Sequence, residues 1–178
     1  MKLLTKTRNK YLVLLGISML TFIVWQWAAE ENYIKVLVNA TNLTIGIIDK
    51  DTHISFDNER ENKSQFIVHT KINDRKGSYP QQAGGAFQPI VIILSWQLFL
   101  FFVLKLKPAL KSAIVNIAIF FLLQMIFLIM LTNYYTSTIQ QYIFDTMMDS
   151  FYVIALILII KDNILYAVFR KEKSKIVS

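Results

Sequence analysis

The chain has 178 residues, of which 54% are hydrophobic, 13% aromatic and 17% charged, and its net charge is +7. This composition is too apolar for a domain with a water-solvated surface and indicates a small integral membrane protein. With no cysteine, five glycines and three prolines, the chain is excluded as a disulfide scaffold, a collagen or an enzyme with a thiol nucleophile.

Residues 11–29 form the first predicted membrane span, because roughly 20 apolar residues cross about 30 Å of hydrocarbon. A basic tail at residues 1–10 precedes it and two glutamates follow it. A secretory signal peptide is the alternative, but cleavage after Ala29 would place Trp27 at the position that requires a small residue. We therefore expect an uncleaved anchor.

Three further spans are predicted, at residues 88–104, 108–132 and 146–168. The first two of these begin near a proline, which suits the first turn of a helix. The last has a purely apolar run only at residues 151–160, about half the length that a span requires. It must therefore include polar neighbours such as Lys161 and Asp162.

The distribution of Lys and Arg predicts the orientation of these spans. Twelve of the 19 basic residues lie toward one side, with four in the N-terminal tail, three at Lys105, Lys107 and Lys111, and five from Lys161 into the basic tail 169–178. Ten of the twelve acidic residues lie on the other side. We expect both termini in the cytoplasm; the resemblance given below implies that the membrane is a bacterial inner membrane. Anionic lipid accounts for the basic charge, so no nucleic-acid partner is expected.

Residues 30–87 form the predicted external segment. Apolar residues recur there at helical spacing and predict an amphipathic helix at about residues 30–41, with a strand through Val36 and Val38 as the alternative. Residues 78–88 are expected to lead back into the membrane as an irregular linker. The predicted fold class is therefore a mainly α membrane protein, with four transmembrane helices and a small external α+β segment.

A β-hairpin is the second predicted element of the external segment. Residues 51–57 and 65–71 alternate in polarity and flank a polar linker. A register in which paired residue numbers sum to 122 sets Phe56 against Phe66 and Asp51 against Lys71. Because a two-stranded hairpin is marginally stable alone, we expect its apolar face to pack on the external helix, the membrane or another protein.

The same register places His53 opposite His69, and these are the two histidines of the chain. One interpretation is a pH-sensitive or weak metal-binding pair, because two imidazolium groups at this distance would repel each other. The other is a pair of polar residues on the wet face of the hairpin. Two histidines without a clear third ligand make a poor zinc site, so neither a metal nor a cofactor is predicted.

Polar side chains inside predicted spans are candidates for contact with a partner or for an intramembrane role, because burying them in lipid is costly. Asp145 and Asp149 share one helical face and are expected near the outer end of the last span, as a helix start. Lys161 can pair with a carboxylate on another helix or subunit, or extend its stem to the cytoplasmic interface, and the adjacent Asp162 is expected to point elsewhere. Asn116 and Gln124 lie on similar faces of the third span and are expected to hydrogen-bond across helices.

The order of elements resembles the small accessory membrane proteins encoded with bacterial exosortases, which are transpeptidase-like enzymes that sort proteins to the cell surface. The features that carry the resemblance are an N-terminal anchor at 11–29, an external β-containing segment at 49–72, and a return marked by Pro and Gly at 79–89 before the later spans. An exosortase itself would need a catalytic cysteine, so the resemblance implies only the companion role.

The functional expectation is a non-catalytic accessory or assembly protein that binds membrane lipid and a larger membrane partner, and the resemblance implies a surface-sorting or export system as its setting. No nucleophile elbow, P-loop or HExxH motif is present in the sequence, so an enzyme is not expected. The alternative is an oligomeric transporter or channel subunit that uses Asp145, Asp149 and Lys161.

Overall fold

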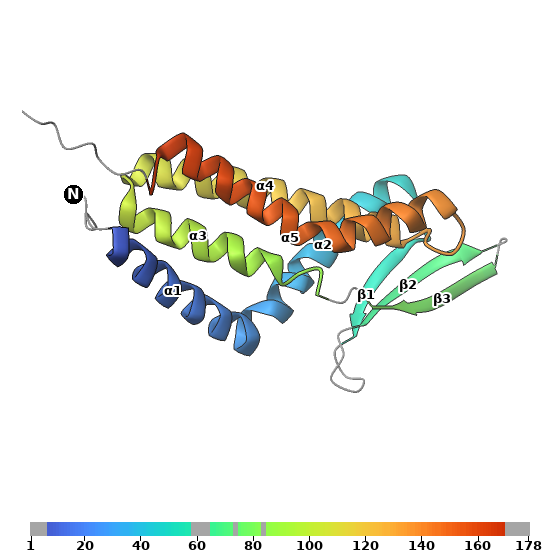
Figure 1. Ribbon diagram of the computed structural model, residues 1–178. Coiled ribbons are helices and arrows are strands. Elements are labelled where there is room, and N and C mark those ends of the chain that lie inside the picture. The colour runs from blue at the N-terminus through green and yellow to red at the C-terminus, as the bar shows by residue number, and fades with distance from the viewer. Residues whose placement is uncertain (1–6, 58–64, 73–74, 83–84, 170–178) are drawn as a thin grey trace, which may run out of the picture.

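A computed structural model of the chain describes residues 7–57, 65–72, 75–82 and 85–169 (Figure 1). The α-helices in this part are α1 (Thr7–Val24), α2 (Glu30–Ile48), α3 (Pro89–Val103), α4 (Leu106–Leu131) and α5 (Thr138–Tyr166). A π-helical turn, η1 (Trp25–Ala29), joins α1 to α2. The strands β1 (His53–Asp57), β2 (Gln65–Ile72) and β3 (Arg75–Gln81) form one antiparallel sheet in the order β1-β2-β3.

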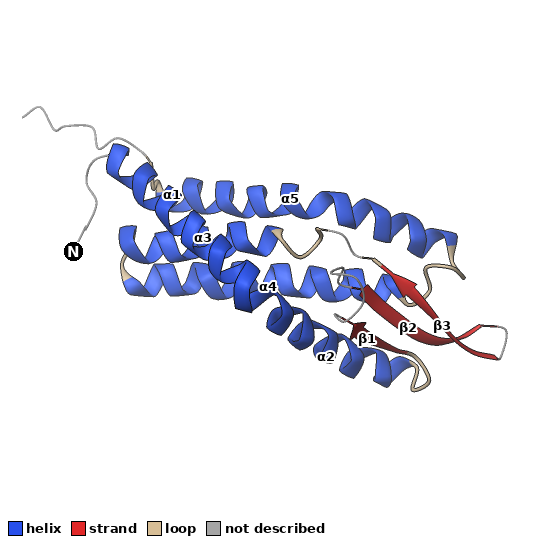
Figure 2. Cartoon of the chain, turned by 90° about the horizontal axis from the view of Figure 1, so that it is seen from below, coloured by secondary structure: helices blue, strands red, loops and turns tan. Residues whose placement is uncertain are grey.

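The helices α1, α3, α4 and α5 lie along one long axis, and the sheet lies at one end of it (Figures 1 and 2). We call that end, where α2 and the α4–α5 connection also lie, the sheet end. At the opposite end α1 begins, α3 turns into α4 and α5 finishes. We call it the basic end, because its described residues include Arg8, Lys10, Lys105, Lys107 and Lys111.

Large apolar side chains cover the outer surface of the helices. On α1, for example, Leu12 is 60% exposed and Met19 is 63% exposed. A continuous apolar surface of this kind is unfavourable in water and favourable against lipid. Three helical stretches are long and apolar enough to cross a membrane, Arg8–Ile48, Leu106–Leu131 and Thr138–Tyr166. These features fit a membrane protein, as the composition predicts.

The prediction of four spans is confirmed only in part. α3 has 15 residues, which rise about 22 Å and fall short of the roughly 30 Å of hydrocarbon. The last helix is longer than predicted, because it starts at Thr138 instead of 146. Its first turn is capped by the Ser137 hydroxyl, which accepts a hydrogen bond from the Gln140 backbone N–H at 3.4 Å. The interpretation of Asp145 and Asp149 as a helix start is therefore wrong.

The helix predicted at about residues 30–41 is confirmed as a helix and continues beyond 41 to Ile48. The alternative of a strand through Val36 and Val38 is wrong, since both residues lie inside α2. The helix ends where the backbone of Asp49 becomes extended and its carboxylate accepts hydrogen bonds from Thr52 Oγ1 at 2.6 Å and the Asp51 N–H at 2.9 Å. These hydrogen bonds hold the pKa of Asp49 below its usual value.

The predicted hairpin register is confirmed. Phe56 lies opposite Phe66, and the Lys71 ammonium pairs with the Asp51 carboxylate. The apolar face of the hairpin is buried, with Ile54 and Val68 at 2% and 0% exposure, and it packs against α2. The contact with the external helix thus supplies the support that the isolated hairpin lacks. The linker at 58–64 lies outside the described residues.

The expectation of an irregular linker at 78–88 is wrong for its first part. Residues 75–81 form β3, which completes the sheet beside β2. The hydroxyl of Tyr79 ties this strand to the end of α4 by donating to the carbonyl oxygens of Leu131 at 2.7 Å and Thr132 at 3.0 Å. The sheet is thereby fixed to both α2 and α4.

The outer edge of β1 is covered by a side chain of α2. The Asn42 amide donates to the Ile54 carbonyl oxygen at 2.8 Å and accepts from the Ile54 N–H at 2.8 Å. An amide side chain thus supplies the pair of hydrogen bonds that a neighbouring strand would supply. At this position the edge is protected against pairing with another chain.

Candidate functional site

A buried carboxylate lies at the centre of the helix bundle. Asp162 of α5 is 1% exposed, and its Oδ2 accepts hydrogen bonds from two helices. From α4, the Ser112 hydroxyl and the Asn116 amide each donate at 2.7 Å. From α3, the Trp96 indole N–H and the Gln97 amide each donate at 3.1 Å. One oxygen atom therefore joins three helices.

The spacing of the donors explains why they converge. Ser112 and Asn116 are four residues apart and so lie on one face of α4. Trp96 and Gln97 are adjacent on α3, which packs against both α4 and α5. Ser112 Oγ also lies 3.1 Å from the Gln97 amide oxygen, so the donors are in contact with one another. We call these residues, together with Lys161, the Asp162 cluster.

Lys161 is the cationic member of the Asp162 cluster. Its Nζ donates to the Asn116 amide oxygen and lies 3.6 Å from Asp162 Oδ1. The lysine is therefore paired, and the expectation that Asp162 points away from it is wrong. The physical reason is the length of the lysine stem, which lets the ammonium group bend around the helix to its neighbour.

The chemistry of the Asp162 cluster is that of a satisfied ion pair. An isolated charge in a low-dielectric interior is very costly, and the cost is offset only by a counter-charge and complete hydrogen bonding. Asp162 has four donors and a nearby ammonium group. Such an arrangement stabilises the ionised carboxylate and fixes the helices relative to one another.

A second polar contact lies nearer the sheet end, around Gln124 of α4. The Tyr33 hydroxyl of α2 donates to the Gln124 amide oxygen, and the Gln124 amide donates to the Ala86 carbonyl oxygen at 3.0 Å. Gln124 is eight residues from Asn116, or roughly 12 Å along the helix. The prediction that Asn116 and Gln124 hydrogen-bond across helices is confirmed.

Asp145 and Asp149 lie apart from Lys161. The Tyr134 hydroxyl donates to Asp145 Oδ1 at 3.4 Å, and Asp149 is exposed. The two carboxylates precede Lys161 by 16 and 12 residues on the same helix, which corresponds to separations of about 24 and 18 Å. Within one chain the structure does not bring these three candidate residues together.

His53 and His69 face each other across β1 and β2, as the register predicts. Their rings stack with centroids 4.4 Å apart, and the Ser55 hydroxyl lies 3.1 Å from His69 Nε2. Burial, and secondarily the neighbouring His53, lower the pKa of His69. In the described ranges no group of three or more His, Cys, Asp and Glu side chains could hold a metal ion.

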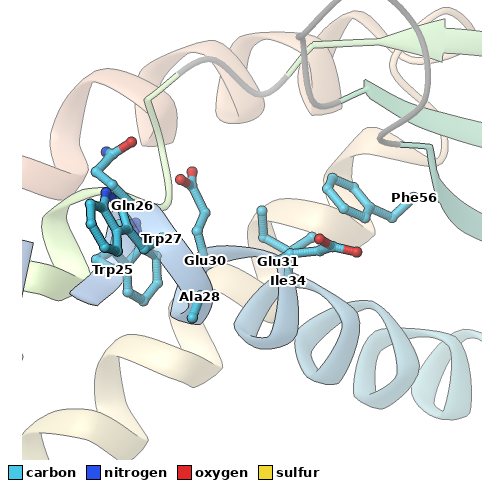
Figure 3. A pocket seen from close by; sticks show the side chains of 8 residues that line it. All are labelled: Trp25, Gln26, Trp27, Ala28, Glu30, Glu31, Ile34 and Phe56. Atoms are coloured by element: carbon cyan, nitrogen blue, oxygen red, sulfur yellow. The ribbon is translucent and has the colours of Figure 1, made fainter. Parts of the chain in front are cut away.

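A pocket of about 190 Å³ lies where α1 passes into α2 (Figure 3). The turn η1 presents Gln26 and Trp25 to it, Glu30 follows on the next turn, and Phe56 of β1 lies on the far side. Trp25 is 2% exposed, and its indole N–H has no hydrogen-bond partner within the described part of the chain. Single π-helical turns are frequent at functional sites, and this one joins α1 to α2.

The sequence analysis did not identify Trp96, Gln97 and Ser112 as members of a site. Gln97 and Ser112 are polar residues inside predicted spans, which is the signal that singled out Asn116 and Gln124. Trp96 gives no such signal, since a tryptophan inside a span is consistent with ordinary apolar packing. Its role follows only from the packing of α3 on α5.

The chain matches no family model, no curated protein and no solved structure. The resemblance to the exosortase-associated proteins therefore stays an expectation that rests on the order of elements.

Proposed function

We propose that the chain is a non-catalytic membrane accessory protein that binds a larger membrane partner through the outward face of α2. The observation that carries this proposal is an apolar stripe, the α2 stripe, formed by Val36, Ala40, Leu43 and Ile47. Val36 is 59% exposed, Leu43 is 76% exposed and Ile47 is 86% exposed. Their spacing of three and four residues puts them on one side of the helix.

The opposite side of α2 is already occupied by the protein's own core. Ile34, Leu37 and Ile45 are each at most 5% exposed and belong to the cluster that includes the sheet. A helix that is apolar on both sides is usually buried on both sides, whereas only one side of α2 packs against the rest of the protein. An additional apolar surface is the simplest covering for the other side.

The position of the α2 stripe favours a protein as its covering. α2 lies at the sheet end, beyond the turn η1, and is set at an angle to α1 (Figures 1 and 2). Because α3 connects the sheet end to the basic end, we propose that α3 completes a fourth crossing despite its length. Together with a cytoplasmic basic end, this topology puts the α2 stripe outside the membrane.

The Asp162 cluster supports an accessory role over a transport role. Its carboxylate and ammonium group bind each other and fix α3, α4 and α5. A transport path through Lys161 and the outer carboxylates Asp145 and Asp149 would have to bridge about 18 to 24 Å of helix. If the resemblance holds, the partner is a protein-sorting enzyme of the bacterial inner membrane.

Site-specific photocrosslinking in native membranes tests this proposal. A photoreactive residue at position 43 or 47 should crosslink to one larger protein in a stoichiometric complex. The double substitution Leu43→Glu and Ile47→Glu should abolish recovery of that protein in mild detergent. Ile48→Glu is the matched control and should leave recovery unchanged, because Ile48 is 78% exposed and is turned by about 100° around α2 from Ile47.

Two outcomes would reject the proposal. Crosslinks formed only to lipid would make the α2 stripe a membrane-surface anchor. Crosslinks formed only to another copy of the chain would make it a homo-oligomer interface, and flux through vesicles containing that oligomer would restore the transporter alternative.

A further inference from the structure

A groove runs between α1 and α5, with α3 as its floor. Its volume is about 410 Å³, and its lining is mainly apolar, formed by Leu14, Ser18, Phe22, Val91, Ile92, Ser95, Trp96, Ile159, Asn163 and Phe169. A buried apolar cavity of about 150 Å³ holds a benzene molecule, and small-molecule sites range from roughly 300 to 1,000 Å³. The groove is therefore large enough for a substantial apolar segment.

We propose that this groove binds one acyl chain of an anionic phospholipid, whose phosphate lies at the basic end of the bundle. The groove lies among the helices that fit a membrane span, so lipid chains are the apolar molecules that meet it. This inference concerns a different surface from the α2 stripe and does not depend on the proposed function.

The direction of the groove determines which headgroup reaches which residues. Leu14, Ser18 and Phe22 follow one side of α1 at intervals of four residues, beginning one turn after Lys10. An acyl chain in the groove therefore starts near the basic end and extends toward the middle of the bundle. Its headgroup then lies at the basic end, beside the exposed Arg8.

The charge of the basic end complements a phosphate. Arg8, Lys105, Lys107 and Lys111 are exposed there, and no exposed carboxylate is found among the described residues of that end. Juxtamembrane Lys and Arg each contribute about 1 kcal/mol to the attraction of an anionic lipid surface. A zwitterionic headgroup would gain much less from this end.

Two contacts join the walls of the groove at the basic end. Lys10 Nζ donates to the Val168 carbonyl oxygen at 2.6 Å, and Tyr11 stacks on Phe169 with ring centroids 4.6 Å apart. These contacts connect α1 to the segment after α5. An ammonium group has three donors, so Lys10 keeps hydrogen-bonding capacity for a phosphate oxygen.

Trp96 provides a direct measurement, because it lines the groove and two of the three tryptophans, Trp25 and Trp27, lie in η1. In the Trp25→Phe, Trp27→Phe variant Trp96 is the sole fluorophore. The variant would be placed in phosphatidylcholine nanodiscs containing brominated phosphatidylglycerol or brominated phosphatidylcholine with identical chains. Bromine quenches indole fluorescence only at contact. We expect phosphatidylglycerol to reach half-maximal quenching at a several-fold lower mole fraction.

Variants separate the groove from the headgroup site. Ser18→Phe fills the groove and should abolish the preferential quenching, whereas Leu20→Phe, on the opposite side of α1 and 64% exposed, should preserve it. Replacing Arg8, Lys105 and Lys107 with Gln should remove the preference for phosphatidylglycerol. Both brominated lipids should then still quench Trp96, and to the same extent.

Native mass spectrometry of the unmodified chain keeps the proposal testable if the tryptophan variant does not fold. From an equal mixture of the two lipids, we expect one retained phosphatidylglycerol per chain. Equal retention or equal quenching of both lipids would overturn the proposal and make the groove part of an ordinary lipid boundary. A dimer whose groove is shielded from bromine would overturn it in favour of a second copy of the chain.

Discussion

Removing the central carboxylate of the bundle, by Asp162→Ala, should destabilise the protein strongly. The substitution leaves four buried donors without their acceptor and leaves the Lys161 ammonium without its counter-charge. Hydrogen bonds between membrane helices average about 0.6 kcal/mol, so four of them give a lower bound of about 2.4 kcal/mol. Breaking a fully buried ion pair from one side costs about 3 to 5 kcal/mol, and this is an upper bound here because the Lys161 side chain is 36% exposed. We expect a loss of about 2.5 to 5 kcal/mol.

The partner substitution, Lys161→Met, should cost less than Asp162→Ala. The Lys161 side chain is 36% exposed, and Asp162 keeps its four donors when the ammonium group is removed. In a double-mutant cycle the two changes should therefore couple, with the double variant more stable than the sum of the single losses predicts. This asymmetry separates a carboxylate held by hydrogen bonds from one held mainly by its counter-ion.

Reversible unfolding in mixed micelles, followed by tryptophan fluorescence, measures these changes. Asp149→Ala is the matched control, because Asp149 lies on the same helix and is exposed. It should change the free energy of unfolding by no more than about 0.5 kcal/mol. If Asp162→Ala is as mild as this control, the carboxylate does not hold the three helices together.

Three further substitutions test how the external segment is attached. Gln124→Leu should speed hydrogen exchange in α2 and cost about 1 kcal/mol, because it removes hydrogen bonds to two other segments; unchanged exchange would contradict this. Tyr79 has its pKa raised by burial to about 12, from an ordinary value near 10, so its contribution to stability is complete below pH 10 and is lost between about pH 10 and 12. The stability difference from Tyr79→Phe should shrink across that window, and a constant difference would refute the assignment. Asn42→Ala should expose the Ile54 amide to faster exchange, while Asn39→Ala should not, and equal rates in the two variants would show that the edge needs no cover.

The hairpin register was predictable because two independent signals agree. Alternation fixes which side chains share a face, and the opposite charges of Asp51 and Lys71 select one register among those that alternation allows. The third strand gives no such signal. β3 contains two basic residues, a glycine and Pro80. Such residues are typical of an edge strand, but glycine and proline are rare in strands generally, so the sequence pattern does not predict a strand here. The strand forms because β2 offers a free edge and α4 holds Tyr79.

The start of α5 could not be predicted from hydropathy, because tertiary packing decides it. The first turns of that helix are polar, yet Phe144 is fully buried and its ring stacks on Phe127 with centroids 4.3 Å apart. Packing against α4 thus stabilises a helical segment that precedes the apolar run. The Asp162 cluster could not be predicted for a related reason. The sequence shows which polar residues lie in the spans, but their convergence on one carboxylate depends on how three helices pack.

The attachment of α1 differs from that of the other long helices, and the lipid proposal depends on this difference. α3, α4 and α5 share the Asp162 cluster, and α2 and α4 share Gln124. The described part of α1 contacts the bundle through apolar packing on α3 and through two contacts at its basic end, made by Lys10 and Tyr11. Apolar packing between membrane helices competes with packing against lipid chains, since lipid is as apolar as the side chains. The boundary of α1 is therefore where a bound acyl chain contributes most, and η1 connects that boundary to the external α2 stripe.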